Sequence, residues 1–369
     1  MIASQIQNIE KKESNSGSKI NRTKKFRFKK IKSSDVSSIC LRLGKMIEDE
    51  IPITSALETI ARDQENLYFQ EIIYKILKRI SKGKSFASSI YDFPNVFNRL
   101  AFSIILAGET SGHLSITLQR LASYFNEKDK LAKKLQAATT YPLFVFAFII
   151  FIVIFIMAFI VPRFKMIFEQ FGGRLPAFTQ AFLGIYDFIQ VNIVYLFITL
   201  ALLLVLSITE KGHFLFSKIK LRIPLIGNLF VQSFMVMFCK TMSILLAAGV
   251  SIVEIFDILI AITDNDVIKT AIIKTKKYII EGSNIHLSAG ASGFFPGLVV
   301  KMMQVAEESG SLPQVLDKTA EHYERKVDAL IITVRSILEP LMIVIAGAIV
   351  MIVVIALYLP ILMMNDGPK

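Results

Sequence analysis

The sequence predicts an all-α membrane protein with two homologous helical domains in tandem repeat and three transmembrane helices. Three observations support this fold class. The 369 residues are 53% hydrophobic and 20% charged, which is too apolar for a soluble chain of this length and too charged for one lying wholly in lipid. Uncharged apolar runs long enough to cross a bilayer interrupt the chain. The polar parts show helical periodicity and repeat one another.

Residues 1–34 form a basic arm. This segment has ten Lys or Arg against two Glu, so it carries +8 of the net charge of +12. It is rich in Asn and Ser, with no apolar stretch ahead of the charges, and we expect no secretory signal peptide in it. We expect a disordered cytoplasmic arm that anionic lipid headgroups attract, by about 1 kcal/mol per cation near the surface. No recognition motif accompanies the charge, so nucleic acid is not an expected partner.

Two regions, 35–139 and 210–339, are expected to be helical domains. Neither shows the alternation of a half-buried strand, and both have apolar residues at helical i, i+3, i+4 spacing. Examples are Ile72, Ile73, Ile76, Leu77 and Ile80 in the first, and Leu245, Leu246, Ile252, Ile255, Phe256 and Leu259 in the second. The stretch 234–262 resembles a further span, but charged residues interrupt it and Gly249 favours a turn, so we interpret it as a buried helix pair.

Three segments are predicted to cross the membrane: 140–162, 188–209 and 340–364. The first contains an uninterrupted apolar run, PLFVFAFIIFIVIFIMAFIV, and the other two lie in uncharged stretches of similar length. A bilayer core of about 30 Å needs about 20 such residues in a helix.

The distribution of cations predicts the orientation. Clusters of Lys and Arg precede the first span and follow the second, whereas the loop 163–187 holds only three cations and the tail 365–369 only one. Cytoplasmic segments carry the excess of Lys and Arg. We therefore expect the N-terminus and both domains in the cytoplasm, and the short loop and the C-terminal tail in the periplasm.

The chain repeats itself. An offset of 198 residues superposes Glu109 on Glu307 and Pro142 on Pro340, and an offset of 199 earlier in the unit pairs Cys40 with Cys239. The repeated unit is a helical domain followed by an outward-going span, with the second span as the return segment. Both cysteines fall on apolar helix faces in a reducing compartment, so we expect core packing and no disulfide.

A duplicated turn is the most specific local signal. It reads GETSGHL at 108–114 and AEESGSLP at 306–313, and Ser-Gly supplies the break between two helices. The residues singled out as a structural or interaction turn are Glu109, Ser111, Gly112, Glu307, Ser309 and Gly310. The two glutamates sit near a helix C-terminus, which the macrodipole disfavours. Either each carboxylate accepts hydrogen bonds from the free N–H groups of the next helix, which we favour, or it contacts a partner or a cation.

Pro142 and Pro340 begin the first and third spans at equivalent places. If the helices that start at Leu114 and Leu312 continue into the membrane, both prolines are interior and become candidate hinges. Pro162 and Pro360 are expected to mark the outer ends of those spans.

No catalytic, cofactor-binding or metal site is expected. The run Lys82-Gly83-Lys84-Ser85 is similar to the end of a phosphate-binding loop. Such a loop needs a glycine five residues before Gly83, where this chain has Lys78, so we interpret Gly83 as a helix C-terminal glycine. The four histidines have no second ligand at metal spacing, and no nucleophile motif is present.

Taken together, the sequence resembles the GspF/PilC family over about residues 35–364. The resemblance rests on the two turns, each followed by a span, on the loop VPRFKMIFEQFGGRLPAFT and on the segment LRIPLIGNL that introduces the second domain. Two positions depart from the repeat: Glu50 stands where the second copy has Gly249, and Asn98 where it has Pro296.

The resemblance implies a non-enzymatic inner-membrane platform protein of a type II secretion system or type IV pilus, with two cytoplasmic six-helix bundles. Its implied partners are a cytoplasmic hexameric assembly ATPase, pilin or pseudopilin subunits, other inner-membrane assembly proteins and further copies of itself, most simply as a homodimer. A transporter or channel is an alternative, although the predicted spans contain no buried ionisable residue. A membrane scaffold or receptor is a third possibility.

Overall fold

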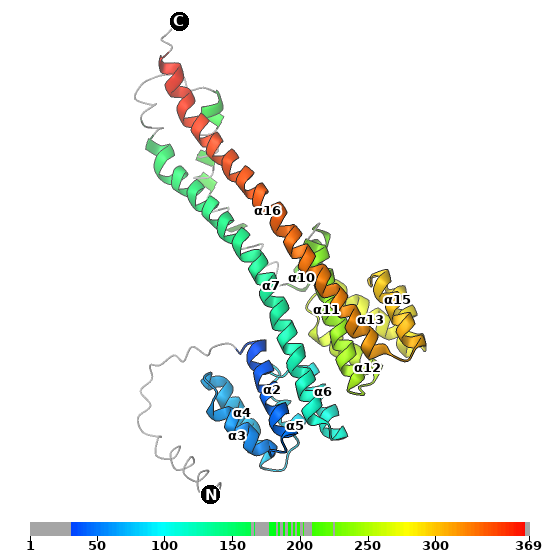
Figure 1. Ribbon diagram of the computed structural model, residues 1–369. Helices are drawn as coiled ribbons and strands as arrows, with labels where there is room; N and C mark the ends of the chain where they lie inside the picture. Colours follow the sequence, from blue (N-terminus) through cyan, green and yellow to red (C-terminus); the bar gives the residue numbers. More distant parts are fainter. Residues whose placement is uncertain are drawn as a thin grey trace, which may run out of the picture.

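The computed structural model is a pair of helical bundles from which two long helices project side by side (Figure 1). The residues it describes are 31–163, 166, 177–181, 184, 187–188, 191–192, 195, 198–199, 202, 209–223 and 226–365. Most of the predicted arm 1–34, most of the predicted span 188–209 and all but one residue of the tail 365–369 lie outside this part of the chain. No strand occurs in the described residues.

Within the described residues, each repeat contributes six helices, as the resemblance implied. Bundle 1 consists of α2 (Ser33–Glu48), α3 (Ile53–Arg62), α4 (Leu67–Ile80), α5 (Phe86–Ile90), α6 (Arg99–Ser111) and the first part of α7 (Leu114–Phe155). Bundle 2 consists of α11 (Ile226–Ala247), α12 (Ile252–Ile262), α13 (Asp266–Ile280), α14 (Ile285–Ser292), α15 (Gly297–Glu308) and the first part of α16 (Leu312–Asn365). The helix α10 (Glu210–Arg222) packs on α11 and α13.

The two bundles pack in the same way, with the first helix of each lying along its long last helix, α2 on α7 and α11 on α16. A hydroxyl joins the helices at the same place in both copies, but from opposite sides. Ser115 Oγ on α7 donates to the Gly44 carbonyl at 2.9 Å, whereas Ser243 Oγ on α11 donates to the Pro313 carbonyl at 2.7 Å. The repeated sequence therefore specifies a repeated contact.

Helix starts are also repeated, sometimes by different chemistry. Asn66 and Asn265 cap α4 and α13, each accepting from two backbone N–H groups. At the start of α6 the Asn98 side chain accepts from Ala101 N at 3.1 Å, while α15 starts with Pro296, whose fixed φ suits a helix entry. The departure at this position thus gives two ways of beginning the same helix.

The second departure lies at the turn after the first helix of each bundle. Glu50 has φ 61° and Gly249 has φ 78°, so both copies need the left-handed conformation there. Among the described residues, Glu50 is the one non-glycine with positive φ. An L-residue with a Cβ pays about 1–2 kcal/mol for this conformation, which glycine avoids.

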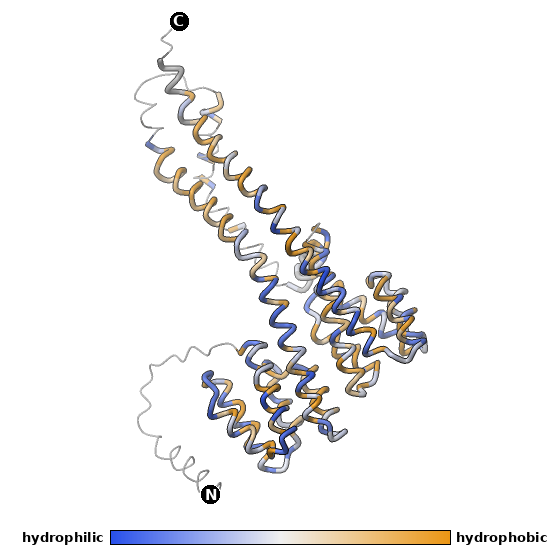
Figure 2. Tube along the Cα trace, in the orientation of Figure 1, coloured by the Kyte–Doolittle hydropathy of each residue, from blue (hydrophilic) through white to orange (hydrophobic). Residues whose placement is uncertain are grey.

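Both long helices run from a bundle into the apolar region without interruption at the inner prolines. The helix α7 has 42 residues and α16 has 54, and Pro142 and Pro340 lie inside them, as the hinge hypothesis required. Hydropathy changes along each helix, from mixed in the bundle to largely apolar beyond it (Figure 2). The apolar windows are almost bare, only 11% and 6% buried, as expected for lipid-facing helices.

The helix α11 is the third described helix that is long and apolar enough to cross a membrane, but 56% of its apolar window is buried inside the protein. It packs along α16 and turns at Gly249 into α12. The structure thus places it in the core of bundle 2, as half of the buried helix pair expected at 234–262.

The expectation that Pro360 marks the outer end of its long helix was wrong, because α16 continues past it; at Pro162 the described helix continues to the next residue, Arg163. A π-helical turn, Ile156–Ile160, precedes Pro162, and α16 continues past Pro360 to Asn365. Proline has no N–H for the carbonyl four residues earlier. For Pro360 that carbonyl belongs to Ala356, and the buried Thr179 hydroxyl donates to it at 2.9 Å. A second segment thus satisfies the group that proline frees.

The turn after the first helix supports a test of the repeat. We expect Gly249→Ala to lower the free energy of unfolding by about 1 kcal/mol, because alanine meets the left-handed penalty there, and Glu50→Gly to leave it unchanged or raise it by up to about 1 kcal/mol. Thermal unfolding of the full-length protein in detergent measures both. Equal losses in the two variants would contradict a shared turn conformation.

Candidate functional site

The duplicated turn builds the same carboxylate cap in each bundle. Glu109 accepts backbone hydrogen bonds from Phe86 and Ala87 at 2.7 and 2.9 Å. Glu307 accepts from the backbone of Ile285 and His286 at 2.7 and 3.0 Å, and its carboxylate also contacts the His286 ring.

The helix that each carboxylate caps is not the one expected from the sequence. We expected each carboxylate to accept from the helix that follows the turn. Instead, each accepts from the N-terminus of a short helix earlier in the chain, α5 for Glu109 and α14 for Glu307. These helices have five and eight residues, too short to be stable alone. A carboxylate on their free N–H groups completes their hydrogen bonding and complements the dipole. Glu109 lies on α6 and Glu307 on α15, the helices that precede α7 and α16. Each cap therefore fixes a short helix to the helix before the long one. We call the apolar part of each long helix, beyond Pro142 or Pro340, its rod.

The Ser-Gly pairs lie where the preceding helix ends. Ser111 is the last residue of α6 and Gly112 follows it with φ 75°; Ser309 caps α15 and Gly310 follows with φ 66°. The six turn residues are brought together only within each copy, as two separate turns.

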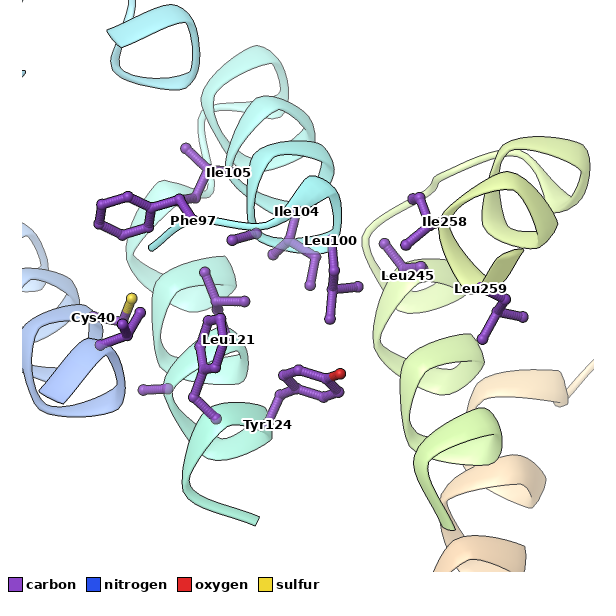
Figure 3. Close-up of a cluster of buried hydrophobic side chains, with 14 of the residues drawn as sticks. Cys40, Phe97, Leu100, Ile104, Ile105, Leu121, Tyr124, Leu245, Ile258 and Leu259 are labelled. Carbon is purple, nitrogen blue, oxygen red and sulfur yellow. The ribbon is translucent and has the colours of Figure 1, made fainter. Parts of the chain in front are cut away.

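The two bundles share one hydrophobic core, which the sequence did not reveal. Figure 3 shows Leu100 and Tyr124 of bundle 1 pointing toward Leu245 and Leu259 of bundle 2. All four side chains are buried, at 1% exposure or less, and belong to one continuous apolar cluster. Separating the bundles would expose this surface at a cost of about 25 cal/mol per Å².

Polar contacts surround this shared core on the bundle surfaces. Ser103 Oγ donates to Glu254 at 3.3 Å, and Arg120 donates to the Ala247 carbonyl at 2.9 Å. Above them, Lys134 of α7 pairs with Asp328 of α16 at 2.7 Å, so the two long helices are tied together before they reach Pro142 and Pro340.

We call the contact of α6 and α7 with α11, α12 and α16 the joint. At its centre, Lys240 bridges the two bundles. Its ammonium lies 2.8 Å from Asp317 of its own bundle and 3.3 Å from Glu127 of α7, and only 12% of its side chain is exposed. Burial alone would lower the pKa of Lys240, but the hydrogen bond to Asp317 and the charge of Glu127 raise it. Burial raises the pKa of Glu127 against the attraction of Lys240.

A cavity of about 270 Å³ adjoins this bridge between α7, α11 and α16. Both signs of charge line it, including Glu127, Lys134, Lys240 and Asp328. One signal in the sequence pointed here: Lys240 interrupts an otherwise apolar stretch. Its partners were not predictable, because they come from segments 77 and 113 residues away.

Other candidate chemistry is structural. Gly83 has φ 84° after the end of α4, so the run Lys82–Ser85 forms the turn between α4 and α5. Cys40 and Cys239 are free and buried, which confirms core packing, and burial raises the pKa of each thiol to about 12. In the part of the chain that the structure describes, no group of three His, Cys, Asp or Glu residues could hold a metal ion.

Comparison with known families agrees with the internal repeat. The family model for type II secretion system (T2SS) protein F matches the chain twice, over residues 39–162 and 238–360. The two matches begin 199 residues apart and end 198 apart, the same offsets as in the repeat. The chain belongs to the type II secretion system protein F family. Each match begins within the first helix of a bundle and continues through the apolar part of its long helix, so the family's unit combines most of a bundle with the span that follows it.

Relatives in this family come from both kinds of machine. The chain is similar to the type IV pilus assembly protein PilC of Thermus thermophilus, at 32% identity over 88% of this chain and 81% of the relative. It is 29% identical to the PilC of Pseudomonas aeruginosa, over 92% of each chain. It is also 28% identical to the type II secretion system protein F of Pseudomonas aeruginosa, over 91% of this chain and 84% of the relative.

The carboxylate caps predict a stability loss confined to one bundle. We expect Glu109→Gln and Glu307→Gln each to cost about 1–3 kcal/mol, because an amide replaces a carboxylate that accepts two N–H groups. Each bundle contains one buried thiol, so alkylation of Cys40 and Cys239 at increasing denaturant, read by mass spectrometry, reports each bundle separately. Glu109→Gln should speed alkylation of Cys40, and Glu307→Gln that of Cys239.

The neighbouring Glu308→Gln is the matched control, because Glu308 is exposed and accepts a hydrogen bond from the Gln304 side chain at 2.9 Å. It should react like the wild type. Unchanged thiol protection in both cap variants would contradict the structural role of the caps.

The bridge at Lys240 predicts a pH-dependent loss. In Lys240→Met the cation that lowers the pKa of Glu127 is gone, so that pKa rises further. A raised carboxyl pKa penalises the folded state as pH increases above about 4.5. The raised pKa of Lys240 itself stabilises the wild type throughout the range below about 10.5. We expect a deficit of about 1–2 kcal/mol at pH 8 that shrinks toward pH 4.5.

Calorimetry of the detergent-solubilised protein across this pH range measures the effect. Lys133→Met is the control, because Lys133 is 66% exposed and pairs only along its own helix with Asp129. A deficit that does not shrink toward pH 4.5 would show that Lys240 does not hold down the pKa of Glu127.

Proposed function

We propose that this chain is the inner-membrane platform protein of a type IV pilus or type II secretion machine, a non-enzymatic part that couples a cytoplasmic hexameric ATPase to the assembly of pilin or pseudopilin subunits. The observation that carries the proposal is the continuity of α7 and α16, each of which runs from a bundle through an interior proline into a bare apolar half. The relatives, a type IV pilus assembly protein and a type II secretion system protein, support the class of machine.

The orientation that suits this role follows the cation distribution. Both bundles lie in the cytoplasm, where an ATPase can reach them, and the tail after α16 lies in the periplasm. Other inner-membrane assembly proteins and further copies of this chain, as a homodimer or a larger oligomer, complete the expected partners.

The joint makes the two bundles a single mechanical body. A displacement applied to either bundle acts on both long helices, because the shared core and the Lys134–Asp328 pair hold them together below the membrane. Above that point each helix lacks the N–H of its inner proline, Pro142 or Pro340, so the carbonyls of Ala138 and Ser336 lose their usual helical partner. Bending costs least there, which makes these prolines the positions at which the rods change direction relative to the bundles.

A complementation experiment tests this function. In a strain lacking the gene, we expect no fibres although the assembly ATPase still hydrolyses ATP in isolation, and the wild-type gene should restore the fibres. Pro142→Ala with Pro340→Ala should insert normally and be at least as stable, since proline is about 3 kcal/mol worse than alanine inside a helix. It should nevertheless restore far fewer fibres, because the hinges are lost.

Pro296→Ala is the control, since this proline starts α15 and lies outside both rods. It should restore fibres fully. Normal fibres in the deletion strain would overturn the platform role, whereas normal fibres in the double proline variant would overturn only the hinges.

A further inference from the structure

The contact between the bundles joins two different faces. Bundle 1 contributes α6 and α7, and bundle 2 contributes α11 and α12, with α16 meeting α7 farther along the long helices. Because the bundles are copies, each also has the face that the other uses. The copy of the α11–α12 face is α2–α3 in bundle 1, and the copy of the α6–α7 face is α15–α16 in bundle 2. Figure 1 shows α3 and α15 on opposite outer sides of the pair.

Burial at equivalent positions shows that both outer faces are open. Leu100 is fully buried in the joint, whereas its copy, Leu298, is 37% exposed. Ile258 is fully buried, and its copy Thr59 is exposed. The same positions are therefore covered in one bundle and bare in the other.

We propose that these open faces bind each other between two copies of this chain, so that the α15–α16 face of one molecule docks on the α2–α3 face of the next and repeats the internal joint. An interface of this head-to-tail kind builds a closed ring when its rotation closes, and a row when it does not. It specifies the surfaces of the homo-oligomer on which the proposed function rests.

The charges of the two open faces are complementary. The positions of Ser103, Arg120 and Glu127 are taken in bundle 2 by three exposed cations, Lys301, Lys318 and Arg325. The opposite face carries three exposed carboxylates at the end of α2, namely Glu48, Asp49 and Glu50, which outnumber the exposed Lys45 one turn earlier. Glu48 is the copy of Ala247, whose carbonyl accepts from Arg120 in the joint, so superposition brings it to Lys318. Opposite charges at these positions favour encounter and fix the register.

The ion pair at the centre of the joint is changed at both of its positions on the open faces. Glu127 pairs with Lys240 inside the chain, and their copies are Arg325 and Leu41. A lysine at position 41 would place two cations opposite each other between molecules. Leucine at position 41, 43% exposed, avoids that repulsion and presents an apolar surface.

The strained residue of bundle 1 lies on the same face. Glu50 holds a left-handed conformation that the second copy assigns to Gly249, at the strain cost noted above. Docking offsets that cost, because Glu50 places a third carboxylate against the basic face of the neighbouring molecule.

Membrane geometry permits the assembly. The long helices α7 and α16 run in the same direction, side by side (Figure 1). The operation that carries bundle 1 onto bundle 2 therefore keeps both apolar halves on one side, and repeating it leaves the next copy in the same bilayer.

Two charge-reversed variants of the full-length protein in detergent test the proposal by native mass spectrometry. The acid-face variant carries Glu48→Lys and Glu50→Lys, and the basic-face variant carries Lys301→Glu and Lys318→Glu. The wild type should form oligomers, and each variant alone should associate at least about tenfold more weakly, equivalent to about 1.4 kcal/mol. Mixing the two variants should restore a dimer, since each supplies the intact face that the other lacks.

The controls are Glu71→Lys on α4 and Lys274→Glu on α13, which are exposed and lie outside both faces. They should associate like the wild type, and protected Cys40 and Cys239 thiols verify that every variant is folded. A monomeric wild type or undiminished association of both variants would overturn the proposal. So would loss in both without recovery on mixing, which would indicate an interface between identical faces. Association is measured without fibre assembly, so this inference and the platform role can fail separately.

Discussion

The architecture depends on one constraint: each bundle is closed by a helix whose other half lies in an apolar environment. In α7 and α16 one continuous helix passes from a bundle into the apolar region. Its first half must therefore present one apolar face to the bundle core, and its second half must be apolar on all sides (Figure 2). The remaining helices of each bundle exist to cover the stripe. The carboxylates of Glu109 and Glu307 then attach the short helices α5 and α14 to the helix that precedes each rod.

Much of this could be predicted from the sequence, because its signals are local or periodic. The apolar runs predicted the two rods, the offsets of 198 and 199 predicted copied bundles, and the interior prolines followed once the helices were continuous. What could not be predicted depends on segments distant in the chain. The Glu109 carboxylate turns back to α5 because the fold places that helix end beside it, and Ala356 keeps a partner only because Thr179 packs there. Lys240 showed as an interruption, but its bridge to Glu127 exists only once the bundles meet.

Where the copies differ, the differences follow their surroundings. Asn98 and Pro296 begin the same helix by different means and change nothing else. By contrast, Lys240 and Leu41, or Ser103 and Lys301, occupy equivalent positions with one member in the joint and the other on an open face. A duplicated domain thus gains an internal interface, and residues on the two sides of that interface differ from their copies on the open faces. This divergence turns a repeat into a body with a defined inside and two distinct outer faces.

We expect the two bundles to move as one body and the long helices to bend only above the joint. Cysteines at Lys134 and Asp328, whose side chains meet between the two long helices at 2.7 Å and are about half exposed, allow the bundles to be locked with a short thiol-specific cross-linker that a reductant removes. The native thiols do not compete, because both are buried with a pKa near 12. The locked protein should support fibre assembly at the rate of the unlocked protein. Assembly that stops on cross-linking and returns with reductant would show that the bundles move against each other, and would contradict the account.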